Sequence, residues 1–159
     1  MEKKKILFVC LGNICRSPSA EAVFNGLIER DGLQDFFVVD SAGITDYHAG
    51  SPADARMQRH AIKRGYNLTS ISRPVDPVTD FREFDMIIGM DNQNIRDLEQ
   101  LATGSDAVSK IFKMTDFCNN CNHDEVPDPY YGGDEGFELV LDLLESACKG
   151  LLGFLKNQK

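Results

Sequence analysis

The sequence predicts an α/β protein: one domain in three layers, with a four-stranded parallel sheet that carries helices on both faces. Short apolar runs that suit strands alternate along the chain with longer segments whose apolar residues recur at helical spacing. The first of these runs is continuous, as expected for a strand that is buried on both faces of a parallel sheet. Strands that alternate with helices build such layered sheets. We therefore expect a single domain over residues 1–159.

The first strand and the first helix are expected on either side of a short loop. The first strand is expected at residues 4–10, and the continuous apolar run starts within it at Ile6. Ser17 and Pro18 then resemble an N-cap followed by a proline at the first helical position. Apolar residues follow at helical spacing, and Gly32 is expected to end the helix.

The middle of the chain repeats the alternation of strands and helices. Ser51 and Pro52 suggest the start of a second helix, which stops near Gly65. Asp91 is expected to cap a further helix that runs towards Leu101. Three more strands are predicted at residues 36–42, 86–90 and, with a weaker pattern, 108–114.

The last helix has the clearest pattern in the sequence. One apolar stripe at helical spacing contains Phe137, Val140, Leu141, Leu144, Cys148, Leu151, Leu152 and Leu155. A stripe of this kind is typical of a helix that packs along one side on the core. Cys148 is accordingly expected to be a core residue.

Composition excludes several classes of protein. The net charge of −8 lacks the basic footprint of a nucleic-acid-binding protein, so no nucleic-acid partner is expected. No apolar run approaches the roughly 18 residues of a membrane span. The five cysteines are an odd number in a chain long enough to build its own core. This favours reduced thiols and a cytoplasmic protein over a disulfide scaffold.

The junction between the first strand and the first helix has the composition of an anion site. The amides of this loop and the helix N-terminus expected after Ser17 can point at one spot. Ligands of parallel sheets bind beyond the carboxyl ends of the strands, where this loop lies. Arg16 can meet two oxygens of a phosphate at once. The same positive environment favours the thiolate form of Cys10, which predicts a nucleophile.

These residues resemble a known family. Cys10-Leu11-Gly12-Asn13-Ile14-Cys15-Arg16-Ser17-Pro18 is similar to the phosphate-binding loop of the low-molecular-weight protein tyrosine phosphatases. The resemblance covers nearly the whole chain. Asp40-Ser41-Ala42-Gly43 resembles the second strand of the family, Met90-Asp91 the end of its third strand, and Asp128-Pro129-Tyr130-Tyr131-Gly132 its general-acid loop.

The resemblance implies a role for each residue. Cys10 would attack phosphorus, Arg16 would stabilise the phosphoryl oxygens, and Asp128 would protonate the leaving phenolate and later activate water. Ser17 would hydrogen-bond the sulfur, and Asn13 would hold the loop in shape. The residues that would surround the phosphate are Leu11, Gly12, Asn13, Ile14, Cys15 and Ser17. No metal and no cofactor are implied.

The resemblance also implies a substrate class. Tyr47, Tyr130 and Tyr131 would form the walls of a cleft that admits an aryl phosphate. The expected partners are phosphotyrosine-containing proteins, with phosphate or vanadate as ligands and inhibitors. Two departures from the family matter here. Ser70 stands near the position where many members carry a histidine that braces the asparagine, and Tyr47 stands where other members have tryptophan.

Other functions on the same scaffold stay open as alternatives. Arsenate reduction needs two further cysteines in a mobile segment, and residues 75–94 contain none. Phosphoarginine hydrolysis goes with a threonine in related enzymes, where this chain has Ile14. A binding module without activity is disfavoured by the intact set of Cys10, Arg16 and Asp128. Cys118, Cys121 and His123 resemble half of a zinc site, but no second pair is near, which favours loop residues without a metal.

Overall fold

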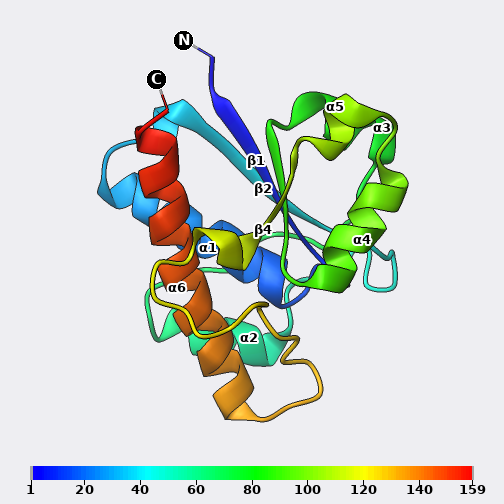
Figure 1. Cartoon of the computed structure of the whole chain (residues 1–159). Helices are drawn as coiled ribbons and strands as arrows, with labels where there is room; N and C mark the ends of the chain where they lie inside the picture. Colours follow the sequence, from blue (N-terminus) through cyan, green and yellow to red (C-terminus); the bar gives the residue numbers. More distant parts are fainter. Residues whose placement is uncertain (1, 159) are drawn as a thin grey trace.

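A computed structural model describes residues 2–158 and confirms the predicted class (Figure 1). Four strands form one fully parallel sheet in the order β2-β1-β3-β4. The strands are β1 (Lys4–Cys10), β2 (Phe37–Gly43), β3 (Met86–Gly89) and β4 (Ile111–Lys113). The helices are α1 (Arg16–Arg30), α2 (Ala55–Ile62), α3 (Pro77–Glu83), α4 (Asn92–Leu101), α5 (Ser105–Val108) and α6 (Asp134–Lys156), with 3-10 turns η1 (Gln34–Phe36) and η2 (Met114–Phe117).

Strand β1 divides the interior into two apolar cores. Ile6, Phe8 and Cys10 belong to the core shared with α1, α2 and α6, whereas Leu7 and Val9 belong to the core under α3, α4 and α5. Figure 1 shows these two groups of helices on opposite sides of the sheet. All five side chains are at most 3% exposed, which explains why the strand reads as a continuous apolar run.

The strand order places a topological switch point at the end of β1. From β1 the chain crosses through α1 to β2 on one side, and β3 then pairs with β1 on the other side. Helices that leave the sheet in opposite directions open a crevice at the carboxyl end of the central strand, where ligands of such sheets bind. The loop after Cys10 lies at this point.

The predicted start of α1 is wrong by two residues. The helix begins at Arg16, its N-cap is Cys15, and Ser17 forms no capping hydrogen bond. The Ser17 hydroxyl lies instead among Cys10, Asn13 and Ala42. Pro18 is tolerated there because the first turn of a helix needs no partner for its amide groups.

Whereas α1 begins earlier than predicted, helix α2 begins later. Its N-cap is Asp54, whose carboxylate accepts hydrogen bonds from the amides of Arg56 and Met57. Pro52 lies outside the helix, in an isolated bridge with Ile71. Helix α3, which follows the cap Asp76, is absent from the sequence prediction.

The last third of the chain agrees with the prediction in outline. Strand β4 is shorter than the predicted residues 108–114, because helix α5 precedes it and turn η2 follows it. Helix α6 buries the whole predicted stripe, including Cys148. Turn η2 packs so closely on α6 that a Cβ atom at Gly150 would lie 1.7 Å from the carbonyl oxygen of Phe117.

The cysteines correct one prediction. Cys118 and Cys121 are joined by a disulfide with their Cα atoms 5.6 Å apart, so these two thiols are not reduced as expected. Cys10, Cys15 and Cys148 are free and buried. Between residues 2 and 158, no three His, Cys, Asp or Glu side chains gather as a metal site would require. Nor does any helix in that range have the length and apolar character needed to cross a membrane.

Candidate active site

The loop between β1 and α1 turns its carbonyl groups outward. The carbonyl oxygens of Cys10 and Leu11 accept hydrogen bonds of 2.9 Å from the amides that follow β2, at Ile44 and Thr45. The carbonyl of Gly12 accepts from the Ser72 hydroxyl at 3.0 Å. In the described part of the chain, the amides of residues 11–16 donate to no protein group. Amides that share a tight loop and lack an acceptor form an anion-binding concavity.

Asn13 holds the tightest bend of this loop. Its φ of 57° is the one positive φ among the non-glycine residues of the range 2–158, in a region where asparagine is better tolerated than most residues. The side chain amide, 1% exposed, donates to Ser17 Oγ at 2.8 Å and to Ser41 Oγ at 3.0 Å. Its oxygen accepts from the backbone amide of Arg73 at 3.0 Å. These three bonds compensate for the strained backbone.

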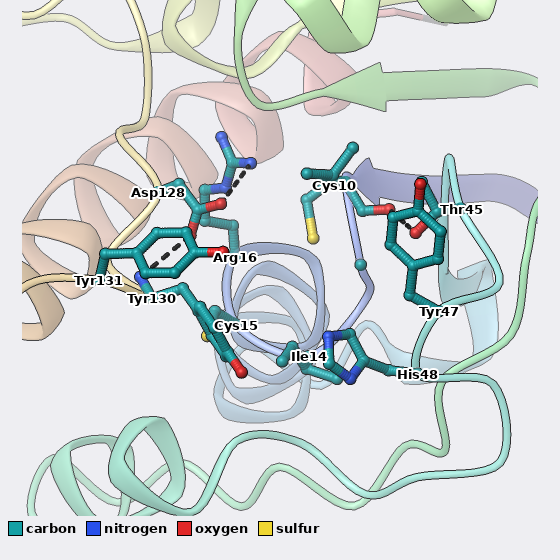
Figure 2. Close-up of a pocket in the computed structure, with 12 residues that line it drawn as sticks. Cys10, Ile14, Cys15, Arg16, Thr45, Tyr47, His48, Asp128, Tyr130 and Tyr131 are labelled. Carbon is teal, nitrogen blue, oxygen red and sulfur yellow. Dashed lines mark hydrogen bonds and ion pairs between the residues drawn. The ribbon is translucent and has the colours of Figure 1, made fainter.

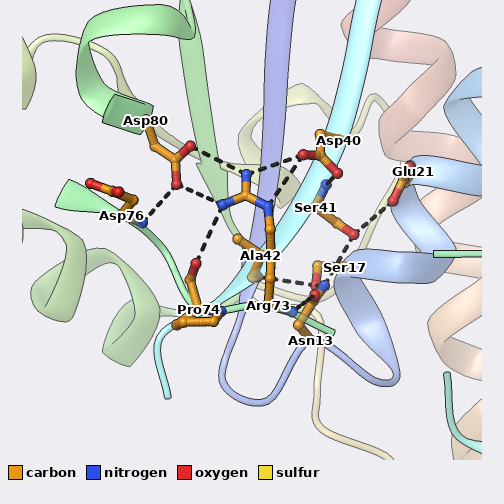
Figure 3. Close-up of polar contacts among 10 residues, drawn as sticks. All are labelled: Asn13, Ser17, Glu21, Asp40, Ser41, Ala42, Arg73, Pro74, Asp76 and Asp80. Carbon is orange, nitrogen blue, oxygen red and sulfur yellow. Dashed lines mark hydrogen bonds and ion pairs between the residues drawn. The ribbon is translucent and has the colours of Figure 1, made fainter. Parts of the chain in front are cut away.

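A polar cluster beneath the loop supports Asn13 (Figure 3). The Ser41 hydroxyl donates to the carboxylate of Glu21 at 2.7 Å, and burial raises the pKa of that carboxyl. The guanidinium of Arg73 is held by Asp40 at 3.1 Å and by Asp80 at 3.0 Å. Ser41 and the Arg73 backbone therefore brace Asn13.

The sulfur of Cys10 lies at the base of the loop. It is 3.1 Å from the Ser17 hydroxyl and accepts the Ser17 amide at 3.4 Å. Figure 2 shows the sulfur pointing into the pocket. The single proton of the Ser17 hydroxyl can be donated to a Cys10 thiolate at 3.1 Å or to the Ala42 carbonyl at 3.3 Å, and the shorter distance is the one to the sulfur. The Ser17 hydroxyl and amide both stabilise negative charge on this sulfur.

Arg16 is fixed from the opposite side of the crevice. Its guanidinium is buried and donates to Asp91 at 2.6 Å and to the Val126 carbonyl at 3.0 Å. Burial disfavours its charge, but the negative charge on Cys10 and the hydrogen bond to Asp91 outweigh burial and raise the pKa of Arg16. The Arg16 guanidinium is therefore permanently charged and held in one orientation beside the sulfur.

Asp128 lies across the pocket from Cys10 (Figure 2). One carboxylate oxygen accepts the Tyr130 amide at 3.0 Å, and the other is 3.7 Å from the Arg16 guanidinium. The side chain is 39% exposed, so a substrate and water can reach it. A carboxyl group above a phosphate loop and opposite a thiol has the position that a proton donor to a leaving group needs.

Twelve residues line the pocket, and most were predicted. Tyr47, Tyr130 and Tyr131 form part of its wall, with Tyr47 80% and Tyr131 93% exposed. The side chains of Asn13 and Ser17 lie beneath the loop, where Asn13 bonds Ser17 and Ser41 and Ser17 contacts the Cys10 sulfur. The complete lining is Cys10, Leu11, Gly12, Ile14, Cys15, Arg16, Thr45, Tyr47, His48, Asp128, Tyr130 and Tyr131.

Sequence reasoning gave no site role to Asp91, Thr45 or His48. Thr45 and His48 line the pocket, and the His48 ring would lie 3.0 Å from a Cβ atom at Gly12. Neither follows a motif, so no local pattern could have identified them. Asp91 was predicted as a helix cap, which is correct, but its second oxygen also holds Arg16. His60, likewise given no partner, contacts Glu138 and Asp134.

Comparison with known proteins places these features in a family. The family model described as "Low molecular weight phosphotyrosine protein phosphatase" matches residues 5–159. The low molecular weight protein-tyrosine-phosphatase YfkJ of Bacillus subtilis is 38% identical over 97% of both chains. The human low molecular weight phosphotyrosine protein phosphatase is 36% identical over 94% of both chains.

Solved structures agree with the sequence comparison. A crystal structure of protein tyrosine phosphatase from Entamoeba histolytica superimposes with a TM-score of 0.94, at 49% identity and 97% coverage of both chains. A Drosophila arginine phosphatase has a TM-score of 0.90 at 32% identity, covering 98% of this chain and 99% of its own. The same scaffold thus occurs in proteins named for two substrates.

Proposed function

The chain belongs to the low molecular weight phosphotyrosine protein phosphatase family, and we propose that it hydrolyses phosphotyrosine through a phosphate ester of the Cys10 thiol. The enzyme class, a cysteine-based protein tyrosine phosphatase, comes with the family. The contacts of Cys10, Arg16 and Asp128 support the role that we assign to each of them. The observation that supports it most is the Cys10 sulfur at the base of a loop whose amides lack acceptors, with Arg16 beside it.

In the first step, the Cys10 thiolate attacks phosphorus in line with the leaving oxygen. The loop amides and Arg16 hold the three equatorial oxygens, where charge is spread in the transition state. Asp128 gives its proton to the departing phenolate, so the tyrosine leaves as a neutral phenol. The aromatic ring of the substrate lies in the pocket, against the wall formed by Tyr47, Tyr130 and Tyr131.

In the second step, water hydrolyses the cysteinyl phosphate. Asp128, now a carboxylate, takes a proton from the attacking water, and inorganic phosphate leaves. The Ser17 hydroxyl and amide stabilise the thiolate as it departs from phosphorus. Arginine and amides supply the charge stabilisation, and the scheme uses no metal or cofactor.

The substrates are phosphoproteins. We infer that phosphate and vanadate compete with these substrates for the loop between β1 and α1. The whole chain, residues 1–159, is proposed to be one catalytic domain. We infer a cytoplasmic enzyme from the three free thiols Cys10, Cys15 and Cys148, although the Cys118–Cys121 disulfide does not add to this argument, and fractionation of the source cells would test it.

Replacement of the nucleophile tests the proposal. Cys10→Ser is expected to abolish turnover of p-nitrophenyl phosphate, because a serine hydroxyl is not ionised in this loop. Phosphate and vanadate should still bind with affinities near those of the wild type, because the amides and Arg16 are unchanged; isothermal titration measures this. Removal of one key catalytic group normally lowers the rate by about 10²-fold or more. Residual turnover within about tenfold of the wild type would therefore rule out the covalent route.

A further inference from the structure

The loop that carries Asp128 has few attachments to the rest of the molecule. We call residues 128–133 the acid loop. Just before it, Val126 is fixed, since its amide donates to Met90 and its carbonyl accepts from Arg16. Within the described residues 2–158, a single hydrogen bond reaches residues 129–133 from outside residues 128–136. Arg56 donates it to the Tyr130 carbonyl at 2.9 Å.

Aromatic contacts reinforce that hydrogen bond. The Arg56 guanidinium carbon lies 5.6 Å from the centre of the Tyr130 ring and 5.0 Å from the centre of the Phe137 ring. Phe137 is fully buried in the first turn of α6. A guanidinium over aromatic faces is attracted by their electron density and, unlike an ammonium, can stack on them. Arg56 thus attaches Tyr130 to a rigid part of the core.

The other side of Arg56 is attached to the phosphate loop. Its Nε and Nη2 atoms lie 3.4 and 3.2 Å from the two oxygens of Asp54. The Asp54 amide in turn donates to the Ile14 carbonyl at 2.8 Å. The Arg56 guanidinium therefore connects the segment next to the phosphate loop with the acid loop. Its planar set of donors contacts the Asp54 carboxylate and the Tyr130 carbonyl together.

The acid loop passes this constraint on to the carboxyl group. The Tyr130 carbonyl is held by Arg56, and the Tyr130 amide donates to Asp128 Oδ1 at 3.0 Å (Figure 2 shows this second bond). The orientation of Tyr130 thereby determines the direction of the Asp128 carboxyl. A displacement of about 1 Å at a reacting group can cost on the order of 10²-fold in rate.

We propose that Arg56 is a positioning residue that holds Tyr130 so that Asp128 faces the leaving-group oxygen. This proposal rests on the proposed role of Asp128 as general acid. It assigns to Arg56 no contact with the substrate. Its effect should therefore appear only in reactions that need a proton from Asp128.

The leaving group separates positioning from other effects. Phenyl phosphate expels a basic phenolate that needs a proton, whereas 2,4-dinitrophenyl phosphate expels an anion that leaves without one. Arg56→Lys keeps the positive charge but loses the planar set of donors that contacts both Asp54 oxygens and the Tyr130 carbonyl at once. We expect kcat/KM to fall by roughly tenfold on phenyl phosphate and less than about twofold on 2,4-dinitrophenyl phosphate, within the 10²–10⁴-fold contribution of general acids.

Two comparisons complete the experiment. Arg59→Lys, on the same helix but at an exposed position, is expected to change neither value. In an Asp128→Asn background, Arg56→Lys should cause no further loss on phenyl phosphate, because the acid is already absent. Arg56→Gln, which lacks the charge and the fork, should repeat the selectivity of Arg56→Lys, and thermal melting checks that each variant is folded.

The outcomes distinguish this inference from the proposed function. If Asp128→Asn lowers the rates on both substrates equally, the acid assignment fails and Arg56 loses its proposed role with it. If Asp128→Asn is selective but both Arg56 variants lose activity equally on the two substrates, or lose none, the positioning role alone is overturned. Selective loss in both Arg56 variants supports it.

Discussion

At the scale of single residues, Asp91 uses its two carboxylate oxygens for two purposes. One oxygen caps α4 by accepting the Asn94 amide at 2.7 Å, and the other holds Arg16 at 2.6 Å. The sequence predicts the first purpose, because an aspartate before a helical segment is a common N-cap. The second depends on β3 lying beside β1, which no local pattern contains. The cap could therefore be predicted from the sequence, whereas the contact with Arg16, which is defined only by packing, could not.

Ile14 provides a test of specificity at this scale. Its side chain lines the pocket and is 9% exposed, so it offers an apolar contact to the leaving group. We expect kcat/KM for phosphotyrosine to exceed that for phosphoarginine in the wild type. Ile14→Thr keeps the branched shape but adds a hydroxyl that can accept from a guanidinium, and should shift the ratio towards phosphoarginine by about tenfold or less.

Side-by-side kinetics on the two substrates measure that ratio. A wild-type enzyme that prefers phosphoarginine would assign this chain to the activity for which the Drosophila structure is named. An unchanged ratio in Ile14→Thr would show that this position does not select the leaving group.

At the scale of elements, the pattern of a capping residue followed by proline explains both successes and errors. The pattern predicts helix starts at Ser17-Pro18 and Ser51-Pro52, but these helices begin at Arg16 and Ala55. It holds at Asp76-Pro77, which caps α3 and was not predicted. The Ser17 hydroxyl contacts the Cys10 sulfur and the Asn13 amide, so it does not cap the helix. Long elements such as α6 were predicted well because their apolar stripe is independent of such competition.

Two glycines of α6 make a matched prediction about packing. Gly→Ala within a helix normally stabilises it by up to about 1 kcal/mol. Gly153→Ala should follow this rule, because nothing lies within 4 Å of its added Cβ atom. Gly150→Ala should instead destabilise the protein by about 1–3 kcal/mol, since the Cβ atom would overlap the backbone of Phe117 and displace η2.

Denaturant unfolding of the two variants measures these changes in the free energy of unfolding. Opposite signs are expected. A Gly150→Ala protein as stable as Gly153→Ala would mean that η2 does not pack on α6 as described.

At the scale of the whole molecule, the layers were predictable and the arrangement within them was not. A continuous apolar strand implies a sheet covered on both faces, and the parallel alternation implies a site at the carboxyl ends of the strands. The order β2-β1-β3-β4 requires knowing which side of β1 each strand joins, and this depends on the packing of distant helices. That order brings Asp128 to Cys10 from the far end of the chain. Only the family resemblance linked these two residues beforehand.

The combined demands of the site predict a pH optimum. The first step needs Cys10 ionised and Asp128 protonated, so kcat/KM should rise and then fall as pH increases. The optimum is expected on the acidic side, because a carboxyl group must keep its proton, and the substrate phosphate, which titrates near pH ~6, narrows the window further. Asp128→Asn should remove the fall on the alkaline side that belongs to the acid. Initial rates across a pH series test this, and an unaltered profile in that variant would remove Asp128 from the acid role.

Trapping the covalent intermediate tests the central claim most directly. In Asp128→Asn, attack on 2,4-dinitrophenyl phosphate should proceed, whereas hydrolysis of the intermediate should be slow because the base is missing. Rapid acid quenching followed by mass spectrometry of the digested protein should then find one phosphoryl group on the peptide that contains Cys10, and none in a Cys10→Ser protein. A phosphoryl group on any other residue, or steady turnover with no phosphorylated Cys10 at any time, would contradict the account.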